Sequence, residues 1–226
     1  MSKKAIIHAI ILARGGSKGI PNKNLVKINN KPLLYWSILQ SRLSKNINHT
    51  WVSSDDSKIL KVARKFGSKT ILRPKKYASD LASSESAWKH AIQYIESEKI
   101  KIDIVVGIQP TSPLRDKDDF DKALKVFKLN KLHSLFSANR TNDTNIWTLK
   151  KGKLKANYNY EKRKMRQEIE EKYLENGSFY IFDKKKFLHY NCRLFGKIGF
   201  YLMKKNNSFQ IDDFEDLKLI KKIFNN

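Results

Sequence analysis

Hydrophobic and polar residues follow two alternating patterns along the chain. Runs that are apolar at nearly every position, such as 5–13 (AIIHAIILA) and 102–110 (IDIVVGIQP), predict strands that are buried on both faces. Between such runs, apolar residues recur three and four positions apart, as in 32–44 (PLLYWSILQSRLS), which predicts a helix that opens at Pro32. Buried strands separated by helices are typical of an α/β fold with a mostly parallel sheet covered on both faces.

The same patterns predict the other elements. Further strands are expected at 49–54, 68–74, 177–182 and 197–203, and further helices at 55–67, 83–99, 116–130, 183–190 and 213–224. Asp55 stands where an N-cap of the helix at 55–67 is expected, and Gly67 stands where that helix ends. Ser83 or Ser84 is expected to cap the helix at 83–99.

Residues from about 139 to 177 have a different texture. Turns, short alternating stretches and dense charge replace the long apolar patterns there. We interpret this stretch as an excursion from the sheet, within a single domain that spans residues 1–226. The apolar side chains on it need a partner, and a second copy of the chain is the commonest one.

Composition supports this picture and narrows the classes of protein. The chain has 226 residues, 40% of them hydrophobic, which suits one large domain with a real core. No apolar run approaches the roughly 20 residues that cross a bilayer, so no membrane association is expected. The basic and apolar start lacks a small-residue cleavage site, which argues against a signal peptide. Cys192 is the single cysteine, so a reducing, cytoplasmic location is expected.

The formal net charge of +24 at pH 7 raises the question of nucleic-acid binding. Lysines are spread along the whole chain, and aromatic residues are not interleaved with them as in surfaces that stack bases. We therefore expect no nucleic-acid partner, but a positive potential that favours anionic ligands in a cleft.

Three loops follow predicted strands and should meet at one edge of the sheet, where open α/β sheets bind ligands. They are 14–24 (RGGSKGIPNKN), 109–115 (QPTSPLR) and 208–217 (SFQIDDFEDL). Glycines in the first loop let backbone N–H groups approach phosphate oxygens, and its arginine and lysines add mobile cations. The spacing fits neither GxGxxG nor a P-loop. Asp212, near this edge, suits a divalent cation that bridges phosphates, since Mg²⁺ uses one or two carboxylates plus substrate oxygens.

Four segments together carry a family resemblance. LARGGSKGIPNKN (12–24), LRPKKYASDLASSESA (72–87), QPTSPLR (109–115) and ENGSFYI (175–181), in this order and spacing, resemble the bacterial CMP-N-acetylneuraminate synthetases (acylneuraminate cytidylyltransferases). The resemblance covers essentially the whole chain. It implies a Rossmann-like three-layer α/β fold, a homodimer formed through the excursion, dependence on Mg²⁺, and transfer from CTP to a nonulosonic acid such as sialic, legionaminic or pseudaminic acid.

The resemblance also implies roles for individual residues. Arg14, Lys23 and Asp212 are expected to be catalytic, with Asp212 as the metal ligand. Nucleotide binding is expected at Arg14, Gly15, Gly16, Ser17, Lys18, Lys23, Asn24, Arg73 and Ser84. Substrate binding is expected at Gln109, Arg115, Arg166 and Tyr180. Each of four residues also has a plain structural interpretation: Arg73 as a surface charge, Ser84 as a helix cap, Gln109 as a strand-end hydrogen bond and Tyr180 as core.

The chain departs from the family pattern in two places. Gln210-Ile211-Asp212 stands where many members have Asp-Ile-Asp, so the number of metal ions stays open, and Asp213 or Asp216 is a possible substitute ligand. Leu174 and Glu175 stand where an arginine often precedes Asn-Gly, which leaves Arg166 or Arg115 to hold the sugar carboxylate. No general base is evident. The alternative functions are a nucleotidyltransferase for another acid sugar or NTP, and a basic nucleic-acid-binding protein.

Overall fold

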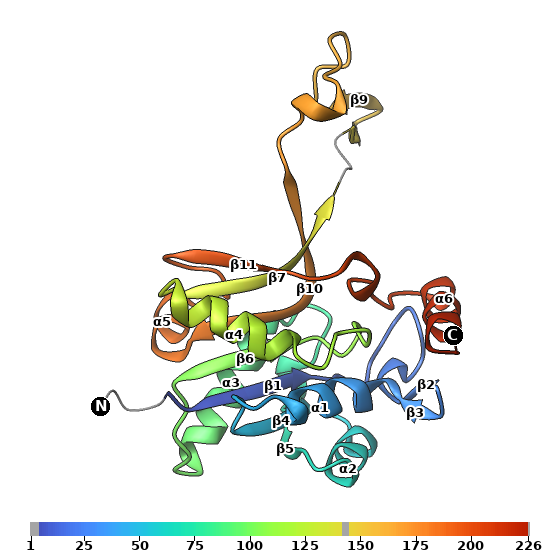
Figure 1. Cartoon of the computed structure of the whole chain (residues 1–226). Helices are drawn as coiled ribbons and strands as arrows, with labels where there is room; N and C mark the ends of the chain where they lie inside the picture. Colours follow the sequence, from blue (N-terminus) through green and yellow to red (C-terminus); the bar gives the residue numbers. More distant parts are fainter. Residues whose placement is uncertain (1–4, 142–144, 226) are drawn as a thin grey trace.

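The computed structural model describes residues 5–141 and 145–225. Its centre is a seven-stranded sheet with the order β11-β7-β10-β6-β1-β4-β5 (Figure 1). The strands are β1 (Ile7–Leu12), β4 (His49–Ser54), β5 (Lys69–Leu72), β6 (Ile104–Ile108), β7 (Ser134–Thr141), β10 (Lys172–Asp183) and β11 (Ile198–Leu202). β10 runs antiparallel to both of its neighbours, and the other pairings are parallel. The expected mostly parallel sheet is therefore confirmed.

Helices cover both faces of this sheet and give it three layers. On one face, α1 (Leu33–Leu43), α2 (Ser57–Lys65) and α4 (Asp119–Leu129) pack in one core cluster with side chains of β1 and β6. On the other face, α3 (Ser84–Ser97) and α5 (Lys184–Tyr190) pack against the opposite side chains of the same strands. A Cβ at Gly107 in β6 would lie 2.6 Å from the Trp88 ring, so glycine there lets α3 approach the sheet closely.

A third, smaller core lies beside the glycine loop that follows β1. It joins α6 (Phe214–Asn225) to the hairpin of β2 (Lys27–Ile28) and β3 (Lys31–Pro32) and to Ile20 of the glycine loop. Short 3₁₀ turns at η1 (Lys23–Leu25), η2 (Lys75–Tyr77) and η4 (Lys205–Asn207) shape the connections. In the part of the chain that the structure describes, no helix has the length and apolar character needed to span a membrane.

The excursion is an arm that extends the sheet. β7 and β10 stay paired as far as Thr141 and Lys172, and Figure 1 shows them leaving the body of the molecule together. Beyond them lie the hairpin of β8 (Trp147–Lys150) and β9 (Lys153–Ala156) and the turn η3 (Arg166–Glu168). The patterns did not predict β7, in which serines interrupt the buried stretch, and they predicted only the second half of β10, whose first four residues are exposed.

One expected cap is wrong by a single residue. The side chain of Asp56, not Asp55, accepts hydrogen bonds from the backbone N–H groups of Lys58 and Ile59 and caps α2. Asp55 instead accepts from the backbone N–H of Gly15 at 3.0 Å. The two adjacent aspartates look alike in the sequence, and only the position of the glycine loop separates their roles. Gly67 does follow the end of α2, with φ of 78°.

Candidate functional site

A cavity of about 460 Å³ lies at the edge of the sheet where β1, β5 and β6 end. That volume is in the range of cavities that hold small ligands. Its described lining includes nine of the predicted site residues: Arg14, Ser17, Lys18, Lys23, Asn24, Arg73, Ser84, Gln109 and Asp212. The fold therefore places residues of the three predicted loops around one cavity. Gly15, Gly16, Arg115 and Tyr180 are not among the described lining residues.

Contacts with other segments of the chain fix the conformation of the glycine loop. Gly15 donates its N–H to Asp55, so this group is already engaged within the chain. A Cβ at Gly19 would collide with the backbone oxygen of Asp212, so only glycine lets the loop pack against that segment. The buried amide of Asn24 donates to the carbonyl of Arg14 at 2.9 Å and fixes the end of β1 to the turn η1.

Three cations of this loop line the cavity, and two of them share one partner. Arg14 and Lys18 both pair with the carboxylate of Asp80, at 2.8 Å and 2.9 Å. Lys23 donates to the carbonyl oxygen of Ile211 at 2.8 Å, and its ammonium lies 3.6 Å from the carboxylate of Asp212. The sequence did not single out Asp80, although the segment that contains it carries part of the family resemblance.

Arg73 is a buried wall of the cavity and not a surface charge. Its guanidinium donates to the carbonyls of Ser53 and Tyr77, at 3.3 Å and 3.4 Å, and its Nε has no protein partner among the described residues. Burial lowers the pKa of Arg73 to about 10, with Asp55 opposing this shift and Arg14 adding to it. A buried donor without a partner at a cavity wall is suited to a polar ligand atom. Ser84 lines the same cavity as the first residue of α3, while Ser83 is the cap.

Arg115 is buried next to the cavity and joins the segments around it by hydrogen bonds. It is 4% exposed, and its guanidinium donates five hydrogen bonds within the chain. The acceptors are the hydroxyl and carbonyl of Ser178, the hydroxyl of Ser37, the side-chain oxygen of Gln40 and the carbonyl of Gln109. Five donors are all that an arginine has, so none is left for a sugar carboxylate. The geometry makes Arg115 a positioning residue for Gln109 and β10.

Tyr180 lies in the core beside the cavity. Its ring packs edge-on against Trp88, and its hydroxyl donates to Glu175. Burial, and then the hydrogen bond to Glu175, raise the pKa of Tyr180 to about 12. Arg193 covers both aromatic rings, at 4.8 Å and 5.1 Å, and makes a bidentate pair with Glu85 at 2.6 Å and 3.0 Å. Sequence reasoning missed the roles of Arg193 and Glu85, which are 108 residues apart and show no local signal.

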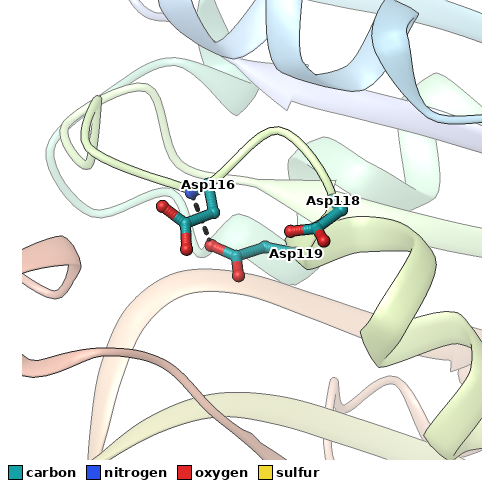
Figure 2. A group of neighbouring side chains, drawn as sticks. All are labelled: Asp116, Asp118 and Asp119. Carbon is teal, nitrogen blue, oxygen red and sulfur yellow. Dashed lines mark hydrogen bonds between the residues drawn. The ribbon is translucent and has the colours of Figure 1, made fainter.

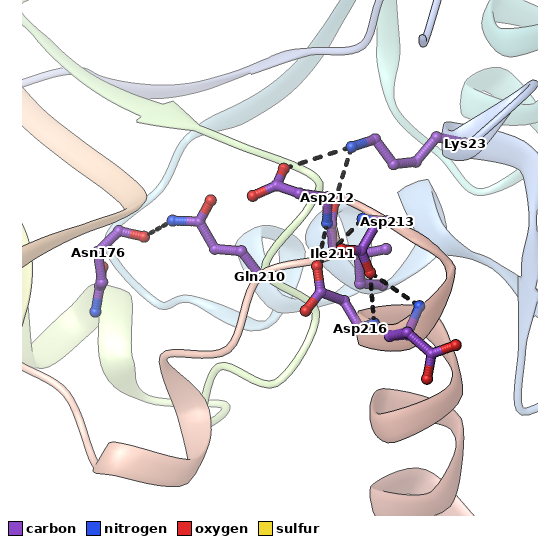
Figure 3. Close-up of polar contacts among 8 residues, drawn as sticks. Lys23, Asn176, Gln210, Ile211, Asp212, Asp213 and Asp216 are labelled. Carbon is purple, nitrogen blue, oxygen red and sulfur yellow. Dashed lines mark hydrogen bonds and ion pairs between the residues drawn. The ribbon is translucent and has the colours of Figure 1, made fainter. Parts of the chain in front are cut away.

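The segment before α6 divides its carboxylates between two tasks (Figure 3). Asp213 accepts from the N–H groups of Glu215 and Asp216, and Asp216 accepts from those of Asp212 and Asp213, which is the reciprocal arrangement of a capping box. Asp212 caps nothing and is 75% exposed beside Lys23. Gln210 points the other way, since its amide donates to the carbonyl of Asn176.

A second acidic group lies on the loop that leads into α4 (Figure 2). The ligand atoms of Asp116, Asp118 and Asp119 lie within 4.8 Å of one another. Each has a partner in the chain: Asp116 pairs with Lys204, Asp118 with Lys122, and Asp119 accepts from Tyr201. These pairs account for the cluster without a metal ion. Arg166, the other arginine expected to bind the sugar, has a side chain that lies outside the described residues.

Residues 8–226 match the family model described as Cytidylyltransferase, and the chain belongs to this family. It is 32% identical to the post-translational flagellin modification protein B of Campylobacter coli over 225 residues, which cover 95% of this chain and 93% of that protein. It is 33% identical to an N-acylneuraminate cytidylyltransferase of Escherichia coli over 218 residues, and there the match covers 94% of this chain and 51% of the relative. The chain thus spans about half the length of that second relative.

The fold has known counterparts. A solved structure of CMP:2-keto-3-deoxy-manno-octonic acid synthetase, complexed with CTP, superposes with a TM-score of 0.72 at 14% sequence identity, over 98% of this chain and 99% of that one. At this identity the likeness concerns the fold alone. The Rossmann-like architecture expected from the sequence is confirmed.

Proposed function

We propose that this protein transfers the CMP group of CTP to a nonulosonic acid and releases pyrophosphate. Membership of the cytidylyltransferase family supports the use of CTP. The name of the Escherichia coli relative, an N-acylneuraminate cytidylyltransferase, supports an acid sugar as the acceptor. The observation that carries the proposal is the cavity, because cations from the glycine loop, Arg73 and Asp212 line one space at the ends of the strands.

In this proposal the cationic loop holds the triphosphate. Arg14, Lys18 and Lys23 supply charge-assisted donors that neutralise the pyrophosphate as it leaves, and Arg73 with Ser84 takes the nucleoside side of the cavity. The anomeric hydroxyl oxygen forms a bond to the α-phosphorus, the bond from that phosphorus to the β-phosphate oxygen breaks, and the hydroxyl proton is released. Such a transfer depends on alignment and charge neutralisation more than on covalent help.

Gln109 is the proposed contact to the acid sugar. It lines the cavity, and its backbone is fixed from two sides, by Arg115 at its carbonyl and by the carbonyl of Ser178 at its N–H. The proposed role of Tyr180 is to support the sugar side of the cavity by packing against Trp88 in the core. Since Arg115 has no spare donor, the proposed ligand of the sugar carboxylate is Arg166.

The residues present fit a Mg²⁺ ion held by one protein carboxylate. Asp212 is exposed beside the cavity and free of helix capping, whereas Asp213 and Asp216 are engaged at α6 and Gln210 is directed to Asn176. When bound with substrate phosphates, Mg²⁺ supplies neutralisation of negative charge. We therefore propose a single carboxylate ligand in place of the pair expected from the common family pattern. Without the ion, the ammonium of Lys23 orients the carboxylate of Asp212.

A homodimer in the cytoplasm completes the proposal. The arm exposes Ile146, Trp147, Leu149, Leu154, Tyr160 and Met165, a set of apolar groups suited to a partner surface.

The test is a panel of acid sugars incubated with CTP and Mg²⁺, with products identified by mass. We expect a CMP-sugar from at least one nonulosonic acid, and competition by other NTPs will show the nucleotide preference. No product with any acid sugar, together with tight and salt-sensitive binding of DNA or RNA, would replace this proposal by the nucleic-acid alternative.

A further inference from the structure

Asp80 contacts two of the loop cations at once. Its Oδ1 lies 2.8 Å from Nη1 of Arg14, and its Oδ2 lies 2.9 Å from Nζ of Lys18. Asp80 belongs to the segment 78–83, which connects η2 to α3 and lines the cavity with five of its six residues. One carboxylate therefore bridges both cations at the lining of the cavity.

A triphosphate needs the same donors. Phosphate oxygens and carboxylate oxygens accept hydrogen bonds from guanidinium and ammonium groups in the same way, so Asp80 and a polyphosphate compete for Arg14 and Lys18. The bonds from Lys18 and Arg14 hold the pKa of Asp80 below its usual range, so the carboxylate stays negatively charged at neutral pH. The competition is therefore between two anions.

The segment that carries Asp80 is built to move at little cost. None of its six residues is buried, and Leu81, which follows Asp80, is 98% exposed, so opening removes no side chain from a core. Its two ends are anchored: Arg73 bonds the carbonyl of Tyr77 on one side, and Ser83 caps α3 on the other. A short exposed segment between fixed ends is the kind of element that opens locally.

We propose that Asp80 is an anionic latch of the cavity, which pairs with Arg14 and Lys18, gives them up to the triphosphate of the nucleotide, and takes them back as pyrophosphate leaves. The latch rests on the proposed function for the identity of the nucleotide. The latch makes a narrower claim that does not depend on the nucleotide: Asp80 weakens the binding of polyphosphate at this site. This claim can be tested by a binding measurement without turnover.

The experiment measures the Kd of inorganic pyrophosphate with Mg²⁺ by calorimetry, for the wild-type chain and for Asp80→Asn. Removing an exposed competing pair should lower the Kd roughly two- to fivefold, the range expected for surface ion pairs. Asp118→Asn is the matched control, because it removes the same charge from an exposed pair with Lys122, 2.8 Å apart, away from the cavity lining. We expect its Kd to stay at the wild-type value.

Four outcomes overturn the latch. An unchanged Kd in Asp80→Asn means that no competition exists, weaker binding means that Asp80 organises the cations for phosphate, and an equal gain in Asp118→Asn means a general effect of net charge. Absence of pyrophosphate binding in every variant also refutes it. Failure of the proposed function is recognised separately. In that case the chain forms no CMP-sugar, and the difference in pyrophosphate Kd between the variants can still be measured. Thermal melts verify that both variants fold.

Discussion

The ammonium of Lys23 donates to the carbonyl oxygen of Ile211 at 2.8 Å and joins residues 188 positions apart (Figure 3). The side chain of Lys23 is only 15% exposed, so it is not the free loop cation that the sequence suggested. Together with the close packing of Gly19 on Asp212, this bond makes the glycine loop and the segment before α6 one unit. The glycine loop and the carboxylate proposed to hold the metal are therefore positioned together.

Arg14→Ala and Lys23→Ala should both lower turnover and differ in stability. Loss of one charge-assisted phosphate contact should reduce kcat/KM for CTP roughly tenfold to a hundredfold, equivalent to about 1.5–3 kcal/mol. Lys23→Ala should also lower the free energy of unfolding by about 1 kcal/mol, because the carbonyl of Ile211 loses its donor. Steady-state kinetics and urea titrations measure the two effects. Wild-type kcat/KM in Arg14→Ala would remove that residue from the triphosphate site.

Asp212 and Asp213 should separate activity from stability. Asp212→Asn should nearly abolish turnover and leave the melting temperature unchanged, since its exposed carboxylate caps no helix. Asp213→Ala should lower stability by about 0.5–2 kcal/mol through loss of the cap of α6 and should keep most of its turnover. Rates and melts of both variants decide the matter. An active but destabilised Asp212→Asn enzyme would exclude Asp212 from the mechanism.

Gln210→Asp should leave the Mg²⁺ dependence unchanged. The side chain at this position is directed to the carbonyl of Asn176, and a Cβ at Gly177 would lie 2.8 Å from its amide nitrogen, so it packs against β10 and not toward Asp212. The shorter, charged side chain should instead reduce stability, because the carbonyl loses its donor. A magnesium titration of kcat/KM beside a thermal melt measures both. A lower Mg²⁺ requirement would show that residue 210 reaches the ion and that the two-carboxylate pattern applies.

The arm should form the dimer contact. Leu149 and Leu154 are paired across the hairpin of β8 and β9 and are 68% and 67% exposed. Changing both to Asp should dissociate the dimer, because charges do not tolerate burial without a partner. Leu129→Asp is the control, as that leucine is 71% exposed at the end of α4 and lies outside the arm. Sedimentation at micromolar concentration should show wild-type and control dimers, and a wild-type monomer would refute the contact.

Stability should fall in mild acid through His8. Burial, and then the charges of His49 and Lys69, lower the pKa of His8 to about 4, with Asp103 opposing the shift. His8 therefore takes up a proton near pH 6.5 in the unfolded chain, but only near pH 4 in the folded chain. Between about pH 7.5 and pH 5 the free energy of unfolding should fall by about 2 kcal/mol from this group, and His49 acts in the same direction. Urea titrations test this, with His8→Leu expected to show the smaller loss.

The sequence by itself determined most helices and strands of the domain and the edge of the sheet where the loops meet. The strand at 49–54 was predicted residue for residue, because Thr50, Trp51 and Val52 prefer extended backbone and turn and capping residues follow the run. The glycine loop and QPTSPLR were placed at the cavity for a similar reason: strand direction follows from the alternation of strands and helices, and parallel strands end at one edge. These signals are local, so one stretch of chain carries each of them.

The tertiary structure decided which atoms each side chain reaches. Arg115 reaches Ser178 over 63 positions and Arg14 reaches Asp80 over 66, and nothing near either arginine in the sequence marks its acceptor. The same holds for Asp55, which is turned to Gly15 over 40 positions while its neighbour caps the helix. A long polar side chain bonds to whatever the folded backbone brings within about 3 Å, and that distance is set by packing of the whole domain. Local preference fixes where a charged residue stands, and only the packed chain selects its partner.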